Sequence, residues 1–158
     1  MKNSIKKGFS FGLTSGIITT LGLMVGMYAG THSKIVVVGA ILVIAIADSL
    51  SDGLGMHLSE ESQKSSTKKG IWQATFSATF TKFIIALTFL IPIFVFSLSS
   101  AIIASIIWGM LLLLVFSYFI AKNRNDNPLW VILEHLVIAI IVIIVSYFVG
   151  QWIGERFN

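Results

Sequence analysis

The sequence predicts an all-α integral membrane protein with five transmembrane helices. The 158 residues are 56% hydrophobic and 11% charged, and the mean hydropathy of +0.91 is far above that of soluble domains. The apolar residues form runs long enough to cross a bilayer at ~20 residues per helix. Short polar segments separate these runs and carry most of the basic residues.

Composition also excludes several classes of site. The chain has no cysteine, so disulfides and thiolate metal sites are excluded, and a metal would need oxygen, nitrogen or thioether ligands. The formal net charge of +4 is not arranged as a basic groove with interleaved aromatic residues, so we expect no nucleic-acid partner. We also find no Walker loop or dinucleotide fingerprint, and we expect no permanently bound cofactor.

The predicted helices form one transmembrane domain, residues 1–158. The apolar run after MKNSIKKG is treated as a retained helix because no convincing small-residue cleavage site follows it. Pro92 should kink the third helix or mark its last turns, and a turn is expected at 97–100. Asn127 is a candidate N-cap before Pro128. The expected ranges are 8–30, 35–57, 72–96, 100–121 and 129–153.

Glycines in the first helix follow a four-residue spacing that lets another helix approach closely. Packing within the chain and the seam of a homodimer both fit this pattern. The glycines are Gly8, Gly12 and Gly16, then Gly22, Gly26 and Gly30.

The basic residues predict the orientation. With the N-terminus in the cytoplasm, eight of the eleven Lys and Arg residues are cytoplasmic, two are outside and Lys82 lies within a helix. The positive-inside rule favours this arrangement, with the C-terminus outside. We expect a prokaryotic cytoplasmic membrane, with lipid around the protein. The cytoplasmic set is Lys2, Lys6, Lys7, Lys64, Lys68, Lys69, Lys122 and Arg124, and the outer set is Lys34 and Arg156.

Two acids in the second helix are the main candidates for function. Asp48 and Asp52 are four residues apart, so they share a helix face with Met56. A carboxylate in hydrocarbon costs about 2.5 to 3.5 kcal/mol on insertion scales. Carboxylates with a thioether and a nearby imidazole suit Fe²⁺ or Mn²⁺ better than Ca²⁺ or Mg²⁺. We therefore interpret them as ligands of a cation in transit.

Depth estimates bring other polar residues to a similar level. At ~1.5 Å of rise per residue, Asp52 lies roughly 7 Å and Asp48 roughly 13 Å from the cytoplasmic end of the helix. Thr14 and Ser15 of the first helix lie roughly 10 Å deep, and Glu134 and His135 of the fifth roughly 8 to 9 Å. We expect these four residues near the acids, although the adjacent pair in the fifth helix cannot both face one site.

Lys82 leaves several roles open. It lies about 8 Å inside the third helix, where it could snorkel to the interface, neutralise an Asp or take part in proton coupling. The acids could also have a purely structural role, paired with Lys82 or hydrogen-bonded to the first helix.

Four segments in order resemble the vacuolar iron transporter family. They are GLTSGIITTLGLMVG, DSLSDGLGMHLSEESQ, TFLIPIF and VSYFVGQWIG. The resemblance implies a homodimer whose first helices line a translocation path, carrying Fe²⁺ and related ions out of the cytoplasm in exchange for protons.

Three departures from the family pattern bear on the cation. Ser15 stands where the family typically has an Asp, and Asp52 stands where it typically has a Met. The long Glu-rich cytoplasmic domain of many members is replaced by the short segment 59–70. Relative to the family pattern, the carboxylate is thus moved from the first helix to the second, with a change in the ligand set.

The resulting hypothesis is a proton-coupled exporter of Fe²⁺-like or Mn²⁺-like ions, and not an enzyme. In a dimer, Asp48 and Asp52 from both subunits would hold the cation, with Ser15 and Thr14 completing the shell. A non-transporting assembly or regulatory protein is the first alternative. An intramembrane metal-dependent hydrolase using His57 and His135 is weaker, because no HExxH spacing occurs.

Overall fold

Five long helical spans make up the described part of the chain. The computed structural model describes residues 2–157, with Lys2 described by its backbone alone. Each span is long and apolar enough to cross a membrane, and no strand occurs in the described chain. The prediction of an all-α protein with five helices long and apolar enough to cross a membrane is confirmed at this level. The spans are Asn3–Thr31, Lys34–Glu61, Lys68–Val95, Leu98–Arg124 and Pro128–Phe157.

Two of the spans are interrupted. The second consists of α2 (Lys34–Val43), the π-helical turn η1 (Ile44–Asp48) and α3 (Ser49–Glu61). The third consists of α4 (Lys68–Thr88) and α5 (Leu90–Val95). Pro92 explains the second break, because its ring conflicts with the carbonyl four residues earlier, which belongs to Thr88. The predicted effect of Pro92 is therefore confirmed.

The other three spans are single helices: α1 (Lys2–Thr31), α6 (Leu98–Arg124) and α7 (Pro128–Phe157). The predicted cap at the start of α7 is confirmed, since the N–H of Leu129 donates to Asn127 Oδ1 over 3.0 Å. Before it, Asn125 ends α6 in the left-handed region, with φ of 58°.

Most helices extend beyond their predicted ranges. Hydropathy marks where the chain leaves hydrocarbon, whereas a helix can continue into the polar layer with its backbone bonds intact. The polar segment expected at 59–70 therefore shrinks to a connection at 62–67, and the one at 122–127 shrinks to 125–127. The turn expected at 97–100 is misplaced, because α5 ends at Val95 and α6 begins at Leu98.

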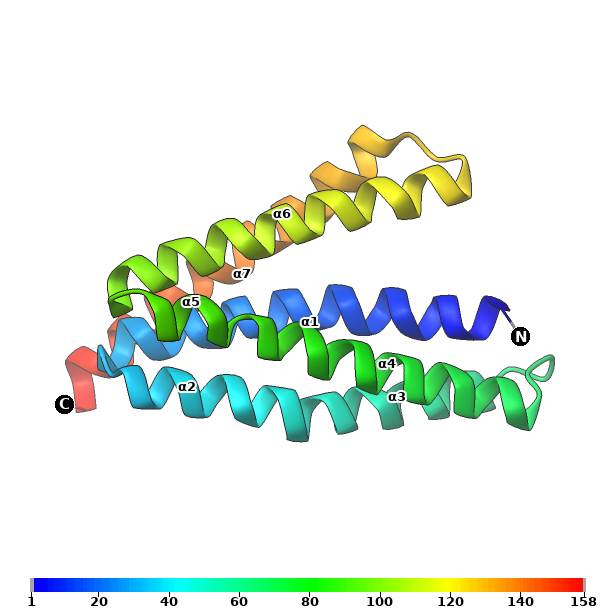
Figure 1. Ribbon diagram of the computed structural model, residues 1–158, viewed down its shortest axis with the longest axis horizontal. Coiled ribbons are helices and arrows are strands. Elements are labelled where there is room, and N and C mark those ends of the chain that lie inside the picture. Colours follow the sequence, from blue (N-terminus) through cyan, green and yellow to red (C-terminus); the bar gives the residue numbers. More distant parts are fainter. Residues whose placement is uncertain (1, 158) are drawn as a thin grey trace.

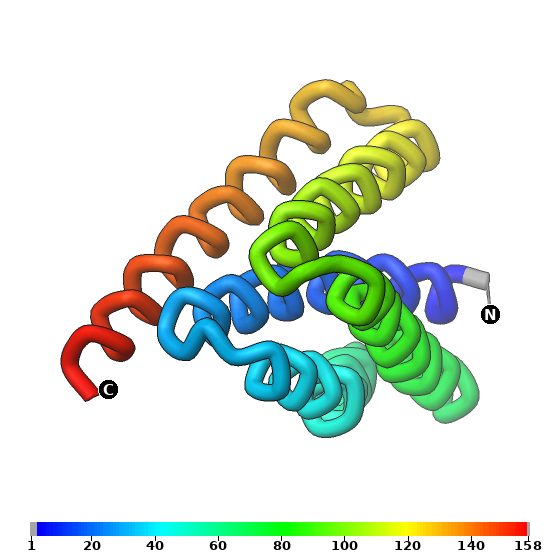
Figure 2. The backbone as a smooth tube through the Cα atoms, turned by 60° about the vertical axis from the view of Figure 1, so that its left-hand side comes forward, coloured from blue at the N-terminus to red at the C-terminus, as the bar shows by residue number. Residues whose placement is uncertain are grey.

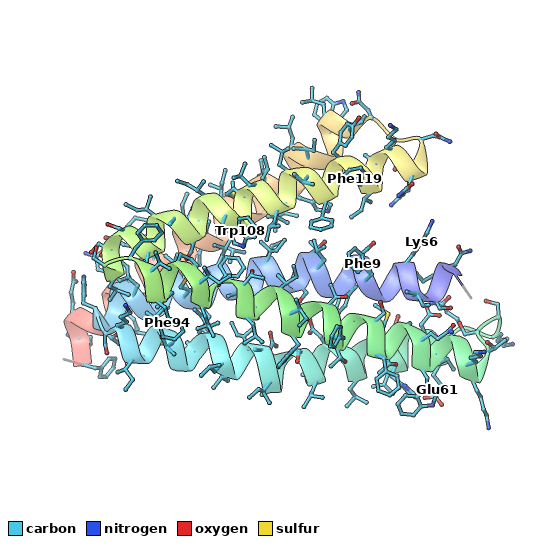
Figure 3. The ribbon with its side chains drawn as sticks, in the orientation of Figure 1. Lys6, Phe9, Glu61, Phe94, Trp108 and Phe119 are labelled. Atoms are coloured by element: carbon cyan, nitrogen blue, oxygen red, sulfur yellow. The ribbon has the colours of Figure 1, made fainter. Side chains whose placement is uncertain are left out.

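The two termini lie at opposite ends of the molecule (Figure 1). The α3–α4 and α6–α7 connections lie at the same end as the N-terminus, and the side chains of Lys6 and Glu61 both lie there (Figure 3). The long helices thus alternate in direction. This arrangement agrees with an odd number of crossings.

Helix α1 packs between α4 and α7 through its glycines. A Cβ at Gly8 or Gly12 would overlap the backbone of Ala74 or Ala78 in α4. Farther along, Gly26 and Gly30 pack against the backbone of Gly150 and Gly154 in α7. The glycine faces therefore serve packing within the chain, which was one of the two expectations. A homodimer remains a prediction, and its seam would need other surfaces of α1.

Helices α6 and α7 form a pair that lies close to α1 near the C-terminal end of α7 and diverges toward the N-terminal end of α1 (Figures 1 and 2). Phe9 of α1 and Phe116 of α6 still make an edge contact, with ring centroids 5.9 Å apart. The α2–α4 group stays close to α1 along its length (Figure 1). Polar residues of α1, α3 and α4 can therefore meet more readily than those at the start of α7.

Candidate cation site

A buried lysine lies at the centre of the polar residues. The Lys82 side chain is 0% exposed, and its Nζ lies 2.5 Å from Asp48 Oδ2 and 2.6 Å from Asp52 Oδ2. It also donates to Ser15 Oγ over 2.9 Å. Of the roles expected for Lys82, pairing with an Asp is the one seen in the structure, and the side chain does not extend toward the membrane surface. We call Ser15, Asp48, Asp52 and Lys82 the Lys82 cluster.

The π-helical turn η1 ends at Asp48, the first of the two acids. The backbone N–H of Ser49 donates to the carbonyl of Ile44, five residues earlier. The hydroxyl of Ser49 donates to the Ala45 carbonyl over 2.5 Å and to the Ile46 carbonyl over 3.1 Å. The turn thus changes the rotation of α3 relative to α2, while the regular spacing after it keeps Asp48 and Asp52 side by side. Single π-helical turns are frequent at functional sites.

Small residues of α1 allow Lys82 to reach the acids. Ser15 Oγ donates to Asp52 Oδ2 over 2.5 Å while it accepts from Lys82 Nζ. A Cβ at the next residue, Gly16, would lie 3.3 Å from both Cα and Cγ of Lys82. The aliphatic stem of Lys82 therefore lies against α1 at a point where a larger side chain would crowd it.

The cluster is open on its carboxylate side. The side chains of Asp52 and Asp48 are 21% and 39% exposed, whereas that of Lys82 is fully enclosed. Taken as ionised, two carboxylates and one ammonium leave a formal charge of −1. A carboxylate within a membrane span must face protein or a water-filled cavity, because hydrocarbon does not solvate it. The exposed side of Asp48 and Asp52 is therefore a surface that lipid alone would not cover.

Two other predicted ligands, Thr14 and Met56, make no polar contact with Asp48 or Asp52 in the described chain. The Thr14 hydroxyl donates to the Ser10 carbonyl over 3.0 Å, within its own helix. Met56 lies one turn beyond Asp52 and is half-buried. Both residues stay predicted ligands, but neither has a polar bond to the acids among the contacts found in the described chain.

Glu134 and His135 belong to the start of α7, where that helix diverges from α1 (Figure 1). His135 Nδ1 lies 2.8 Å from the hydroxyl of Ser117 in α6, and Glu134 is exposed. In residues 2–157, no group of three or more His, Asp or Glu side chains could hold a metal ion. Glu134 and His135 therefore do not join Asp48 and Asp52 within one chain, although their estimated depths are similar.

His57 also has its own neighbours. Its Nδ1 lies 3.1 Å from Thr75 Oγ1, and its ring meets the Trp72 ring edge-on at a centroid distance of 4.7 Å. His57 thus contacts α4, while His135 contacts α6. The two histidines proposed for a hydrolase have separate partners.

A second buried acid lies outside the predicted site. Glu60 is 3% exposed, and its Oε1 accepts from Lys7 Nζ over 2.8 Å. Its Oε2 accepts from Ser66 Oγ over 2.9 Å. The sequence placed Glu60 in a polar segment, and nothing in its spacing indicates burial. This contact joins α1, α3 and the connection at 62–67.

A scan of protein-family models and a search of curated proteins find no match for this chain. The likeness to vacuolar iron transporters therefore rests on the four sequence segments quoted above.

Proposed function

We propose that the protein transports a divalent transition-metal cation across a membrane, and that Asp48 and Asp52 bind the cation during its passage. The observation that carries this proposal is the pairing of both carboxylates with one buried ammonium while each keeps an exposed side. The cluster already holds a positive charge between two carboxylates. A cation that arrives from the exposed side would compete with Lys82 for the same oxygen atoms.

Energetics favour a functional interpretation of this buried ion pair. Moving charges out of water costs several kcal/mol per ion, and well-packed apolar residues often serve stability equally well. The long stem of Lys82 carries a compact charge with several rotatable bonds, so its ammonium can move as a cation enters. A site with a movable internal cation can bind and release its ligand, as transport requires.

The proposed direction is out of the cytoplasm in exchange for protons, in a prokaryotic cytoplasmic membrane. The excess of Lys and Arg at the N-terminal end supports a cytoplasmic N-terminus and an outer C-terminus. The resemblance to vacuolar iron transporters supports export and proton exchange. Oxygen ligands with the nearby thioether of Met56 support Fe²⁺ or Mn²⁺ as the cation.

We further propose that the protein acts as a homodimer. The partly exposed Asp48 and Asp52 need cover within the membrane, and a second copy would bring two more carboxylates to the same site. Since the glycines of α1 already contact α4 and α7, the seam would use the face of α1 that carries Ser15. Four carboxylates from two chains would supply a ligand set that one chain lacks.

Uptake by purified protein in liposomes tests this function. Fe²⁺, Mn²⁺, Co²⁺ and Zn²⁺ would be supplied separately while internal pH is recorded, with protein-free liposomes as the control. We expect uptake of at least one ion together with a pH change. If none of the four enters faster than in the control, the transporter proposal fails.

One observation favours a second candidate, a non-transporting assembly or regulatory protein. Lys82 pairs with both acids inside the chain, so the Lys82 cluster could serve only to join α1, α3 and α4. Exchanging the charges of Lys82 and Asp52 by a double substitution tests this candidate. Recovery of the folded protein by the double variant, with no metal binding by the wild type, would support it.

A further inference from the structure

A groove with a graded polarity runs along the outer face of α4, away from the Lys82 cluster. Its volume is about 670 Å³, and Ile5 of α1 forms part of its wall. Four polar residues recur along it at four-residue intervals: Lys69, Gln73, Ser77 and Thr81. Three exposed aromatic residues follow the same interval beside them: Trp72, Phe76 and Phe80, at 53%, 65% and 67% exposure.

The polar residues lie at increasing depth from the helix end. At ~1.5 Å of rise per residue, Gln73 lies roughly 6 Å and Thr81 roughly 18 Å below Lys69. Lys69 is the second residue of α4, and its side chain is exposed. The Ser77 hydroxyl is already bonded to the Ile5 carbonyl over 2.9 Å. Charge is therefore found at the membrane-surface end of the groove, and aromatic surface extends below it.

Gln73 is one of three residues with a buried, unsatisfied polar side-chain atom in the described chain; the others are Thr20 and Ser105. The Oε1 atom of Gln73 is buried and has no hydrogen-bond partner within the described chain. An amide has two donor hydrogens and an acceptor oxygen, and turning the group exchanges their positions. An unsatisfied polar group beside hydrocarbon lowers stability. Because Oε1 itself is buried, a polar group of an occupant would bond to the part of the Gln73 amide that lines the groove.

We propose that this groove binds an acidic glycerophospholipid from the leaflet on the N-terminal side. The phosphate would lie at Lys69, the glycerol ester region at Gln73, and an acyl chain along Phe76 and Phe80. This order of polarity is the order found along a phospholipid. The groove lining includes one cationic side chain and no carboxylate, which favours an acidic headgroup over a zwitterionic one.

The proposal goes beyond transport and rests only on the chain spanning a membrane. Lys82 of the same helix points to the opposite side, toward Asp48 and Asp52. Lipid retention can therefore be measured without any transport assay.

Native mass spectrometry of purified protein tests the proposal. The protein would be titrated with phosphatidylglycerol and, separately, with phosphatidylcholine. We expect the wild type to retain phosphatidylglycerol preferentially. Lys69→Gln should lower that retention about fivefold, the factor for one lysine near an anionic surface, and Gln73→Leu should also lower it. Lys68→Gln is the matched control, because Lys68 is exposed but does not line the groove.

Three results would overturn the proposal. Equal retention of the two lipids would mean that the groove does not select an acidic headgroup. An equal loss in Lys68→Gln and Lys69→Gln would mean general attraction to charge. The third result is a second copy in the groove. Because the chain has no cysteine, Phe80→Cys provides a single thiol, which should stay uncrosslinked under mild oxidation in the membrane. Efficient disulfide formation between two copies would show that protein covers this face.

Discussion

Lys82 Nζ lies 2.6 Å from Asp52 Oδ2, and the same carboxylate oxygen accepts a hydrogen bond from Ser15. These contacts connect α4, α3 and α1 through one oxygen atom. The charge of Asp52 would therefore serve two roles, because it holds the three helices together and would also bind the cation.

Removal of the Lys82 charge should strengthen metal binding. Lys82→Met keeps much of the side-chain volume but takes away the internal cation that competes for Asp48 and Asp52. At an effective dielectric constant of ~20, a unit charge ~4 Å away contributes about 4 kcal/mol, so the apparent Kd for Mn²⁺ should fall by at least about tenfold.

Isothermal titration of the purified variant with Mn²⁺ measures this change. Without metal, the variant should unfold at a lower temperature than the wild type, because two carboxylates lose their buried partner. Added Mn²⁺ should restore its unfolding temperature. Loss of stability with no response to Mn²⁺ would instead support the assembly protein.

Ser15 and Asp52 should be exchangeable as a pair. The double variant Ser15→Asp with Asp52→Met reproduces the arrangement that the resemblance implies, with the carboxylate on α1 and the thioether on α3. We expect it to keep metal uptake and to shift the preference toward Fe²⁺. Competition between Fe²⁺ and Mn²⁺ in the liposome assay measures the shift. Asp52→Met alone is the control and should lose uptake.

Packing of α1 on α4 should be sensitive at Gly12. A side chain there meets the backbone of Ala78, so Gly12→Leu should lower the free energy of unfolding by at least about 1–3 kcal/mol. Gly55→Ala is the matched control, because nothing lies within 4 Å of its added Cβ. Since Ala favours helix over Gly, the control should be neutral or slightly stabilising. Thermal unfolding in detergent compares the two, and equal effects would argue against this helix contact.

The bond between Glu60 and Lys7 should stabilise the N-terminal end of α1. Glu60→Gln keeps a polar group for Ser66 but removes the charge that Lys7 contacts, so we expect a loss of about 1–3 kcal/mol in the free energy of unfolding. Glu61→Gln is the control, because the Glu61 side chain is exposed. Chemical unfolding followed by tryptophan fluorescence can measure both. No difference between the variants would mean that the buried bond adds nothing to stability.

The helices and the pairing of Asp48 with Asp52 on one face follow from patterns that the sequence displays. Hydropathy locates each crossing, and the four-residue interval places the acids together. The π-helical turn that ends at Asp48 could not be predicted, because the run IVVVGAILVIAIAD has the pattern of an ordinary apolar helix. Lys82 pairs with the acids because its stem fits beside Gly16 of α1. This fit depends on how the helices pack, which the sequence pattern does not show.

The depth estimates correctly placed Ser15 beside the acids, but they did not place the residues at the start of α7 correctly. Helices α1, α3 and α4 run close together, so residues at one level can meet there. The α6–α7 pair diverges from α1 toward the N-terminal end of α1 (Figure 1). His135 there contacts Ser117 of α6. A one-dimensional depth contains no information about the angle between helices. For the same reason, the burial of Glu60 could not be seen in the sequence.

Metal-driven proton flux in proteoliposomes that carry Asp52→Asn tests whether Asp52 binds the transported cation and couples it to protons. Asn keeps the size of the side chain and can still accept from Ser15, but it lacks the charge that a cation would bind. Asp126→Asn, which alters an exposed acid at the α6–α7 connection, is the matched control. We expect metal-dependent proton flux in the wild type and the control, and its loss in Asp52→Asn. Unchanged flux in Asp52→Asn would contradict a coupling role for this carboxylate.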